Sequence, residues 1–307
     1  MSASIQEMGG AGARARPPRA TAGVPAVDLN DGHAIPQLGF GVFQTDPKET
    51  ARAVSLALDV GYRHIDTAPT YGNEKAVGEA VRSSGLGRDA VFVTSKLDNA
   101  FHRPDSARAA FERTLAALRF DYVDLFLIHW PLPMRYGGDF ESTWSTLEEF
   151  RRDGRARSIG VSNFEVDHLQ RLVAASDVVP AVNQIELHPY LRNGDVDAHG
   201  RAHGIATAAW SPMAHGWVLD DPTVVGIAGR LGRSPAQVVL RWHIERGGVV
   251  CPKSATPARI EENFQVFDFQ LEPDDVERLD ALDRGEAGRT GPHPDRFVTD
   301  AFAAGVD

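Results

Sequence analysis

From Leu38 onward the chain repeats one unit, a short apolar strand that leads through a loop into a helix of roughly 10 to 15 residues. The expected strands cover residues 39–43, 63–67, 91–95, 123–129, 157–161, 181–185, 206–210 and 248–251. The expected helices cover residues 47–60, 74–83, 105–118, 141–152, 166–175, 195–203, 234–245 and 256–263. Strand–helix alternation, with no block of strands alone or of helices alone, predicts an α/β protein folded as a closed (β/α)8 TIM barrel.

An open, doubly wound parallel sheet is the rival architecture. A dinucleotide-binding sheet of that kind normally carries a G-x-G-x-x-G turn after its first strand. Residues 38–42 (LGFGV) hold two glycines, but these lie inside the expected first strand and no third glycine opens a helix. We therefore reject that fingerprint and expect the barrel.

The two ends of the chain extend this barrel. Residues 1–24 are rich in Gly, Ala, Pro and Arg and lack apolar periodicity, so we expect a disordered extension there. Asp31-Gly32 supplies the turn of a short N-terminal β-hairpin within residues 26–35. An extra helix begins at Glu272 and a C-terminal tail follows it. We expect residues 25–307 to form a single domain, because barrels routinely use 250 or more residues as one unit.

Composition excludes several classes of protein. The net charge of −10 argues against nonspecific binding of nucleic acid, and no run approaches the roughly 18 apolar residues of a membrane span. Cys251 is the only cysteine, which excludes an internal disulfide and a multi-cysteine metal site and favours a reducing, cytoplasmic setting. The sequence holds no H-E-x-x-H motif, in which two helical histidines accompany a carboxylate, so we expect no metal. Only four of the 32 basic residues are lysines, and two of them are Lys96 and Lys253.

The carboxyl ends of barrel strands carry the active site, and the sequence places four polar side chains there. Asp66 ends the second strand and Tyr71 follows it, Lys96 ends the third strand, and His129 ends the fourth. An ammonium next to a phenol lowers the pKa of that phenol, and a carboxylate keeps the ammonium charged and in place. The four groups together form a coherent proton-transfer set in which the tyrosine is the acid.

At this point the sequence resembles the aldo-keto reductase superfamily, most closely the prokaryotic branch that includes 2,5-diketo-D-gluconate reductases. The resemblance runs in order from about residue 25 to the C-terminus. Its segments are residues 61–68 (GYRHIDTA), 71–74 (YGNE), 93–97 (VTSKL), 127–131 (LIHWP), 160–164 (GVSNF), 183–190 (NQIELHPY) and 252–263 (PKSATPARIEEN). Residues 282–286 (LDRGE) and 290–295 (TGPHPD) in the tail support the branch.

The resemblance implies residue roles. Tyr71 matches the general acid, Asp66 and Lys96 match the groups that tune it, and His129 matches the group that orients the carbonyl oxygen. It also implies NADPH as the hydride donor. The matching cofactor contacts are Ser162, Asn163 and Gln184 for the carboxamide, Trp210 for stacking on the nicotinamide, Ser211 beside it, Lys253, Ser254 and Arg259 for the 2′-phosphate, and Glu262 and Asn263 for the adenine.

Independent physical reasoning supports the phosphate site, because Thr256-Pro257 opens a helix next to Lys253 and Arg259.

Other residues receive weaker interpretations. We expect His64 and His188 to be packed structural histidines, and Cys251 to be a buried residue of the last strand. The resemblance assigns Phe43 and Trp130 to the substrate pocket. Asp98 stands where many members of the branch have a tryptophan, and we hypothesise that it disfavours anionic substrates. The remaining pocket walls are expected from residues 132–140, 213–221 and the tail beyond 285.

Together these interpretations predict an NADPH-dependent oxidoreductase that reduces small aldehydes or ketones to alcohols. The alternative is a barrel that binds NADPH as a redox sensor or regulatory subunit without significant turnover. We expect a small-molecule carbonyl substrate, no nucleic-acid partner and no membrane association. For the oligomeric state, we expect a monomer, with a weak homodimer as the alternative.

Overall fold

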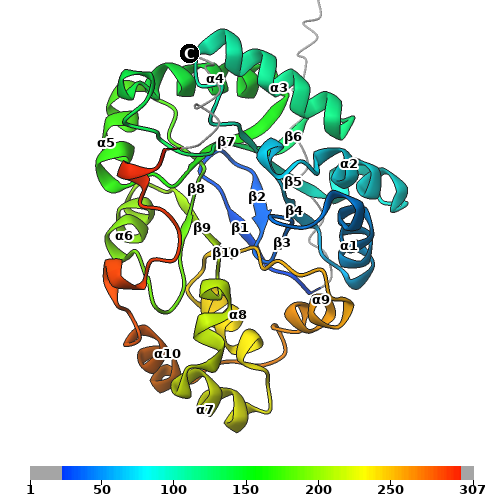
Figure 1. Ribbon diagram of the computed structural model, residues 1–307, viewed down its shortest axis with the longest axis vertical. Coiled ribbons are helices and arrows are strands. Elements are labelled where there is room, and N and C mark those ends of the chain that lie inside the picture. The colour runs from blue at the N-terminus through cyan, green and yellow to red at the C-terminus, as the bar shows by residue number, and fades with distance from the viewer. Residues whose placement is uncertain (1–22, 299–307) are drawn as a thin grey trace, which may run out of the picture.

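The structure is a computed structural model that describes residues 23–298, so the expected extension over residues 1–24 lies almost wholly outside the described part. Helices surround a central parallel sheet (Figure 1). The strands of the sheet follow the order of the sequence from β3 to β10, and isolated parallel bridges join Leu38 to Val250 and Gly41 to Lys253. These bridges connect the first strand to the last. The predicted (β/α)8 barrel is therefore confirmed.

The barrel strands lie close to the predicted positions. They are β3 (Phe40–Gly41), β4 (His64–Asp66), β5 (Phe92–Leu97), β6 (Val123–Ile128), β7 (Ala156–Ser162), β8 (Val182–Glu186), β9 (Ala206–Trp210) and β10 (Val249–Val250). The helices are α1 (Pro47–Val60), α2 (Glu74–Ser83), α3 (Pro104–Leu118), α4 (Glu141–Arg152), α5 (Val166–Ala175), α6 (Gly194–Ala202), α7 (Pro222–Leu231), α8 (Pro235–Glu245), α9 (Pro257–Phe264) and α10 (Pro273–Asp280).

Helix starts follow from local chemistry. Ser234 accepts a hydrogen bond from the backbone N–H of Gln237, whose side chain in turn accepts from the Ser234 N–H, and Pro235 occupies the first helical position of α8. Such a reciprocal capping box satisfies donors that the first turn leaves without partners. At α1, Asp46 caps the backbone N–H of Lys48 at 2.8 Å. These caps explain why the predicted helix starts are accurate.

Helix α7 is an element that the sequence pattern did not predict. It contains Gly226 and Gly229, and each glycine in a helix interior costs about 1 kcal/mol relative to alanine. The helix forms because Asp221 caps the Thr223 N–H, and because Val224 and Ile227 are fully buried. Tertiary packing thus overrides a weak local preference here.

The main core lies between the sheet and the helices, where Phe111 of α3 stacks on Phe150 of α4 at 4.2 Å between ring centroids. A second core lies inside the barrel at the amino ends of the strands. The antiparallel hairpin of β1 (Ala26–Asp28) and β2 (Ala34–Pro36) contributes Leu29 and Ile35 to it. The hairpin therefore closes one end of the barrel and leaves the carboxyl ends of the strands for the site.

Candidate active site

Asp66, Tyr71, Lys96 and His129 meet at the carboxyl ends of β4, β5 and β6. Lys96 Nζ donates to Asp66 Oδ1 at 2.7 Å and to the Thr67 carbonyl at 3.0 Å. Lys96 Nζ also lies 5.1 Å from the Tyr71 ring centroid, and the Tyr71 and His129 centroids are 6.0 Å apart. The structure thus brings together all four side chains that the sequence placed on one rim.

A short loop fixes Tyr71. The residue ends a 3₁₀ turn (Pro69–Tyr71), and Gly72 adopts a φ of 69° to terminate it. Buried Asn73 ties the loop down, because it accepts from the Thr67 hydroxyl and donates to the Val42 carbonyl, both at 2.9 Å. Asn73 belongs to the YGNE segment, but its role in holding this loop was not predicted from the sequence.

The electrostatics of the four groups differ in one respect from expectation. Burial raises the pKa of Tyr71 above 10, and the lowering effect of Lys96 does not offset it. We expected the ammonium to produce a net lowering of this pKa, and that expectation is wrong. Burial opposes the Lys96 charge, but Asp66 and Tyr71 raise the pKa of Lys96 above its ordinary value.

His129 remains neutral at ordinary pH. Burial and the nearby Lys96 charge hold its pKa well below 6.5. Its Nδ1 atom is buried and has no hydrogen-bond partner within residues 23–298. A neutral imidazole can donate or accept a hydrogen bond, but it is not a proton source at neutral pH.

The residues predicted to hold a nicotinamide lie beside these four groups. Asn163 Nδ2 donates to the His129 carbonyl at 2.9 Å, and Asn163 Oδ1 accepts from the Trp210 indole N–H at 2.8 Å. Gln184 Nε2 donates to Asp66 Oδ2 at 2.9 Å, and the Ser162 hydroxyl donates to the Gln184 carbonyl. Amide side chains and a half-buried indole provide the chemistry that an aromatic carboxamide requires.

The predicted phosphate site also has suitable chemistry. Lys253 and Arg259 are exposed, and neither has an ion-pair partner among residues 23–298. Lys253 precedes α9, which begins at Pro257 after Thr256, and Arg259 lies in the first turn of that helix. Two unpaired cations beside a helix N-terminus fit a phosphate monoester. Glu262 accepts from the Ser234 hydroxyl, while Asn263 is buried.

The predicted pocket residues occupy the same end of the barrel. Phe43 is half exposed and lies 5.0 Å from the Tyr71 ring centroid, and Trp130 packs on Phe297 at 4.1 Å. Asp98 is half-buried and accepts from the Ala100 backbone N–H at 2.9 Å. Leu97 is the register partner of Ile128, so Asp98 follows at the level of His129 on the neighbouring strand.

Three residues that we expected to be structural are buried and engaged with neighbours. His64 Nε2 lies 3.0 Å from the Thr94 hydroxyl, and its ring packs on Phe92. His188 Nε2 lies 3.0 Å from Glu186 Oε1. Cys251 is 8% exposed, directly after β10.

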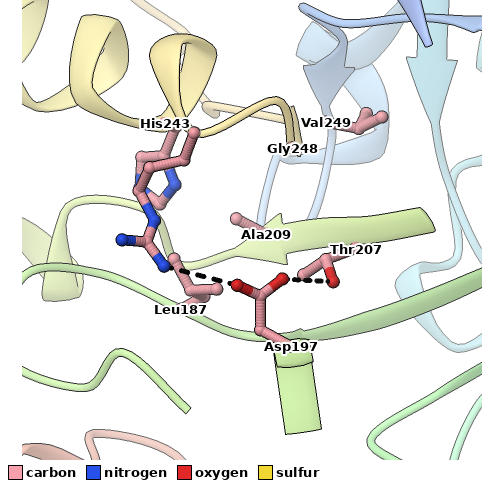
Figure 2. Close-up of a pocket in the computed structure, with 8 residues that line it drawn as sticks. Leu187, Asp197, Thr207, Ala209, His243, Gly248 and Val249 are labelled. Atoms are coloured by element: carbon pink, nitrogen blue, oxygen red, sulfur yellow. Dashed lines mark hydrogen bonds and ion pairs between the residues drawn. The ribbon is translucent and has the colours of Figure 1, made fainter. Parts of the chain in front are cut away.

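A separate cavity lies between the sheet and helices α6 and α8. Figure 2 shows Asp197 there beside Thr207, whose hydroxyl donates to Asp197 Oδ1 at 2.8 Å. Arg246 donates to the other carboxylate oxygen at 3.3 Å. The cavity measures about 20 Å³, which is room for roughly one water molecule, and none of the four rim residues lines it. It is too small to be a substrate site.

Sequence reasoning missed the contacts through which the C-terminal tail closes over this end of the barrel. Glu186 at the end of β8 accepts hydrogen bonds from the backbone of both Thr290 and Gly291. The NQIE segment was visible in the sequence, but no local spacing relates it to residues about 100 positions later.

Comparison with known proteins identifies the class of this fold and site. The aldo/keto reductase family model matches residues 37–284. An aldo-keto reductase from Mycobacterium sp. (strain JLS) is 49% identical over 275 residues, which cover 90% of this chain and 98% of that protein. The methylglyoxal reductase DkgA of Yersinia pestis is 46% identical over 279 residues, covering 90% and 98% of the two chains.

A solved structure agrees with this result. A mutant of Gox0644 in complex with NADPH matches with a TM-score of 0.86 at 42% identity, covering 90% of this chain and 99% of that one. The chain therefore belongs to the aldo/keto reductase family, as its sequence motifs predicted. It is an NADPH-dependent oxidoreductase that acts on carbonyl groups, and the prediction of NADPH as cofactor is confirmed.

No helix within residues 23–298 is both long and apolar enough to cross a membrane. Over the same residues, no group of three or more His, Cys, Asp or Glu side chains is placed to hold a metal ion.

Proposed function

We propose that Tyr71 is the acid that protonates the carbonyl oxygen of a small aldehyde or ketone as it is reduced. NADPH, when bound, supplies the hydride. The observation that carries this proposal is the buried Lys96–Asp66 pair directly beside Tyr71, with a neutral His129 facing the same ring. No such arrangement is needed by a barrel that only senses NADPH, so the geometry supports turnover.

The assignment of Tyr71 rests on the protonation states of the rim. His129 carries no proton to give at neutral pH because its pKa lies well below 6.5, so it serves as a hydrogen-bond partner that orients the carbonyl oxygen. Tyr71 stays protonated because burial raises its pKa. Lys96 is charged and adjacent, so it stabilises negative charge that develops on the phenol as the proton leaves.

The cofactor contacts form the second part of the proposal. Ser162, Asn163 and Gln184 hold the carboxamide, Trp210 lies against the nicotinamide ring, and Ser211 lies beside it. Lys253, Ser254 and Arg259 bind the 2′-phosphate, and Glu262 and Asn263 contact the adenine. The unpaired cations at the start of α9 and the amide cluster beside His129 support these roles.

The test is the Tyr71→Phe variant, assayed by NADPH oxidation at 340 nm. We expect kcat to fall by about 100-fold or more, the lower end of a general-acid contribution, with the NADPH dissociation constant changed less than twofold. Tyr122→Phe is the matched control, because Tyr122 precedes β6 at the opposite end of the barrel. A loss of NADPH affinity as large as the loss of rate contradicts the acid role.

For the substrate, we propose that Asp98 makes neutral carbonyls better substrates than carboxylate-bearing ones. A half-buried carboxylate at the level of His129 supports this, because it repels a second negative charge in the pocket. The test compares kcat/KM for methylglyoxal and for 2,5-diketo-D-gluconate in the wild type and in Asp98→Asn. The variant should gain activity selectively toward the acid, and exposed Asp105→Asn serves as the control. A strong wild-type preference for the acid refutes the idea.

We propose a cytoplasmic location and a monomer for this enzyme. A single, buried cysteine that needs no oxidising compartment supports the location. Size-exclusion chromatography with light scattering tests the monomer.

A further inference from the structure

The buried carboxylate of Glu186 anchors the middle of the tail segment 285–297, which is called the strap below. Glu186 is 1% exposed, and its Oε1 accepts from the Thr290 backbone N–H at 2.6 Å and from the Thr290 hydroxyl at 2.5 Å. Its Oε2 accepts from the Gly291 N–H at 3.0 Å. His188 Nε2 adds a further contact to Oε1 at 3.0 Å. Burial raises the pKa of Glu186, but these hydrogen bonds bring it below its ordinary value, so the carboxylate stays charged.

At this anchor the strap backbone meets the edge of Trp210. A Cβ atom on Gly291 would lie 2.5 Å from Trp210 Cη2 and 3.2 Å from Cζ3, closer than van der Waals contact allows. Glu186 is also the register partner of Trp210 across β8 and β9. A glycine is therefore required here, because the strap main chain itself packs on the indole.

The opposite edge of the same indole is fixed by the amide cluster. The Trp210 N–H donates to Asn163, and Asn163 donates to the His129 carbonyl. The strap also places Phe297 on Trp130, next to His129 in sequence. Trp210 is thus held between the strap on one edge and the residues around His129 on the other.

We propose that Glu186 is a positioning residue, which sets the orientation of the Trp210 indole by anchoring the strap at Thr290 and Gly291. This inference rests on the proposed role of Trp210 as the surface against which the nicotinamide lies. In this arrangement Glu186 touches neither cofactor nor substrate, and its effect on NADPH binding passes entirely through Gly291 and Trp210.

Two variants disturb the contact from its two sides. Glu186→Gln replaces an oxygen that accepts hydrogen bonds with an amide donor, and Gly291→Ala places a methyl group against the indole. Each has a matched control. Asp124→Asn removes another buried carboxylate that accepts a backbone N–H, at the opposite end of the barrel, and Gly226→Ala adds a methyl group where nothing lies within 4 Å.

The readouts are the NADPH dissociation constant by isothermal titration calorimetry, the urea unfolding midpoint and kcat. We expect Glu186→Gln and Gly291→Ala each to weaken NADPH binding by about tenfold, a coupling within the range for residues in contact. Asp124→Asn should lower the unfolding midpoint and leave the NADPH dissociation constant within twofold of the wild type. In a Trp210→Ala background, Glu186→Gln should add less than twofold.

The possible results distinguish the positioning role of Glu186 from the stacking role of Trp210 on which it rests. If Trp210→Ala weakens NADPH binding while Glu186→Gln and Gly291→Ala alter only the unfolding midpoint, the strap is merely structural and the inference is overturned. The same holds if Glu186→Gln keeps its full effect in the Trp210→Ala background. If Trp210→Ala leaves NADPH binding unchanged, the proposed stacking role fails, and the inference fails with it.

Discussion

Replacing Lys96 by methionine tests whether the buried ion pair serves stability, catalysis or both. Lys96 and Asp66 form a 2.7 Å contact, with side chains that are 1% and 9% exposed. The substitution keeps an apolar chain of similar length and removes only the ammonium. It leaves the Asp66 carboxylate buried, with the Gln184 amide as its remaining hydrogen-bond donor among the contacts of the structure.

The expected loss of stability is large. Removing one partner of a buried pair costs about 3–5 kcal/mol, because the other charge stays buried without compensation. With a urea m-value of about 3 kcal/mol/M, the unfolding midpoint should fall by about 1–2 M. Catalysis should fall by about 100-fold or more, because the phenol loses the adjacent positive charge that stabilises it during proton transfer.

The double variant Lys96→Met/Asp66→Asn separates the two effects. A neutral amide in place of the carboxylate removes the uncompensated charge, so most of the lost midpoint should return. Activity should not return, because Tyr71 still lacks its ammonium. The assays are urea unfolding followed by circular dichroism and NADPH oxidation at 340 nm, with exposed Lys75→Met as the control. Recovery of activity in the double variant, or an unchanged midpoint in the single one, refutes the reasoning.

Two further expectations follow from other parts of the molecule. Arg259→Ala should weaken NADPH binding by about 10- to 100-fold, which corresponds to the loss of hydrogen bonds to a charged group, and should have little effect on NADH binding. The control is Arg278→Ala at an exposed residue, which should change the binding of neither cofactor. Equal weakening of NADPH and NADH binding contradicts the 2′-phosphate role. Burial lowers the pKa of His64 and His102 to about 4 and of His243 to about 3, so below about pH 6.5 the unfolded chain takes up protons that the folded chain excludes. The free energy of unfolding should fall between pH 7.5 and 5.5 by about 1.4 kcal/mol per buried histidine. The measurement is the urea unfolding midpoint of the wild type and of His243→Gln across this range. An equal pH dependence of the midpoint in the two proteins would argue against this expectation.

Most of the barrel was predictable because its signals are local. Capping residues such as Ser234, followed by Pro235, mark helix starts, and runs such as Val123–Ile128 mark strands that are covered on both faces. Helix α7 was not predictable, since its glycines argue against a helix and its stability comes from buried contacts that the local sequence does not reveal.

In the site, too, the features with local sequence signals were predicted and those that depend on tertiary structure were not. Side chains at strand ends, such as Asp66 and His129, were placed correctly because barrel topology alone brings strand ends together. The direction of the Tyr71 pKa shift was not predicted correctly. It depends on whether the effect of burial on the phenol exceeds the opposite effect of the Lys96 charge. The Glu186 contact to the strap also escaped prediction, because it joins segments about 100 residues apart and its carboxylate makes those bonds to backbone groups that carry no sequence signal.

Lysine is scarce in this chain, and the structure gives a physical reason for its use at position 96. The composition uses arginine for most positive charges, yet within residues 23–298 the cation that is fully buried is Lys96. Its ammonium reaches Asp66 Oδ1 and the Thr67 carbonyl while lying beside the Tyr71 ring. The compact ammonium of a flexible lysine side chain can reach these partners from within the barrel. A planar guanidinium would bring additional hydrogen-bond donors for which the site provides no acceptors. The site therefore requires the compact charge of lysine at position 96, and the wider guanidinium of arginine does not meet that requirement.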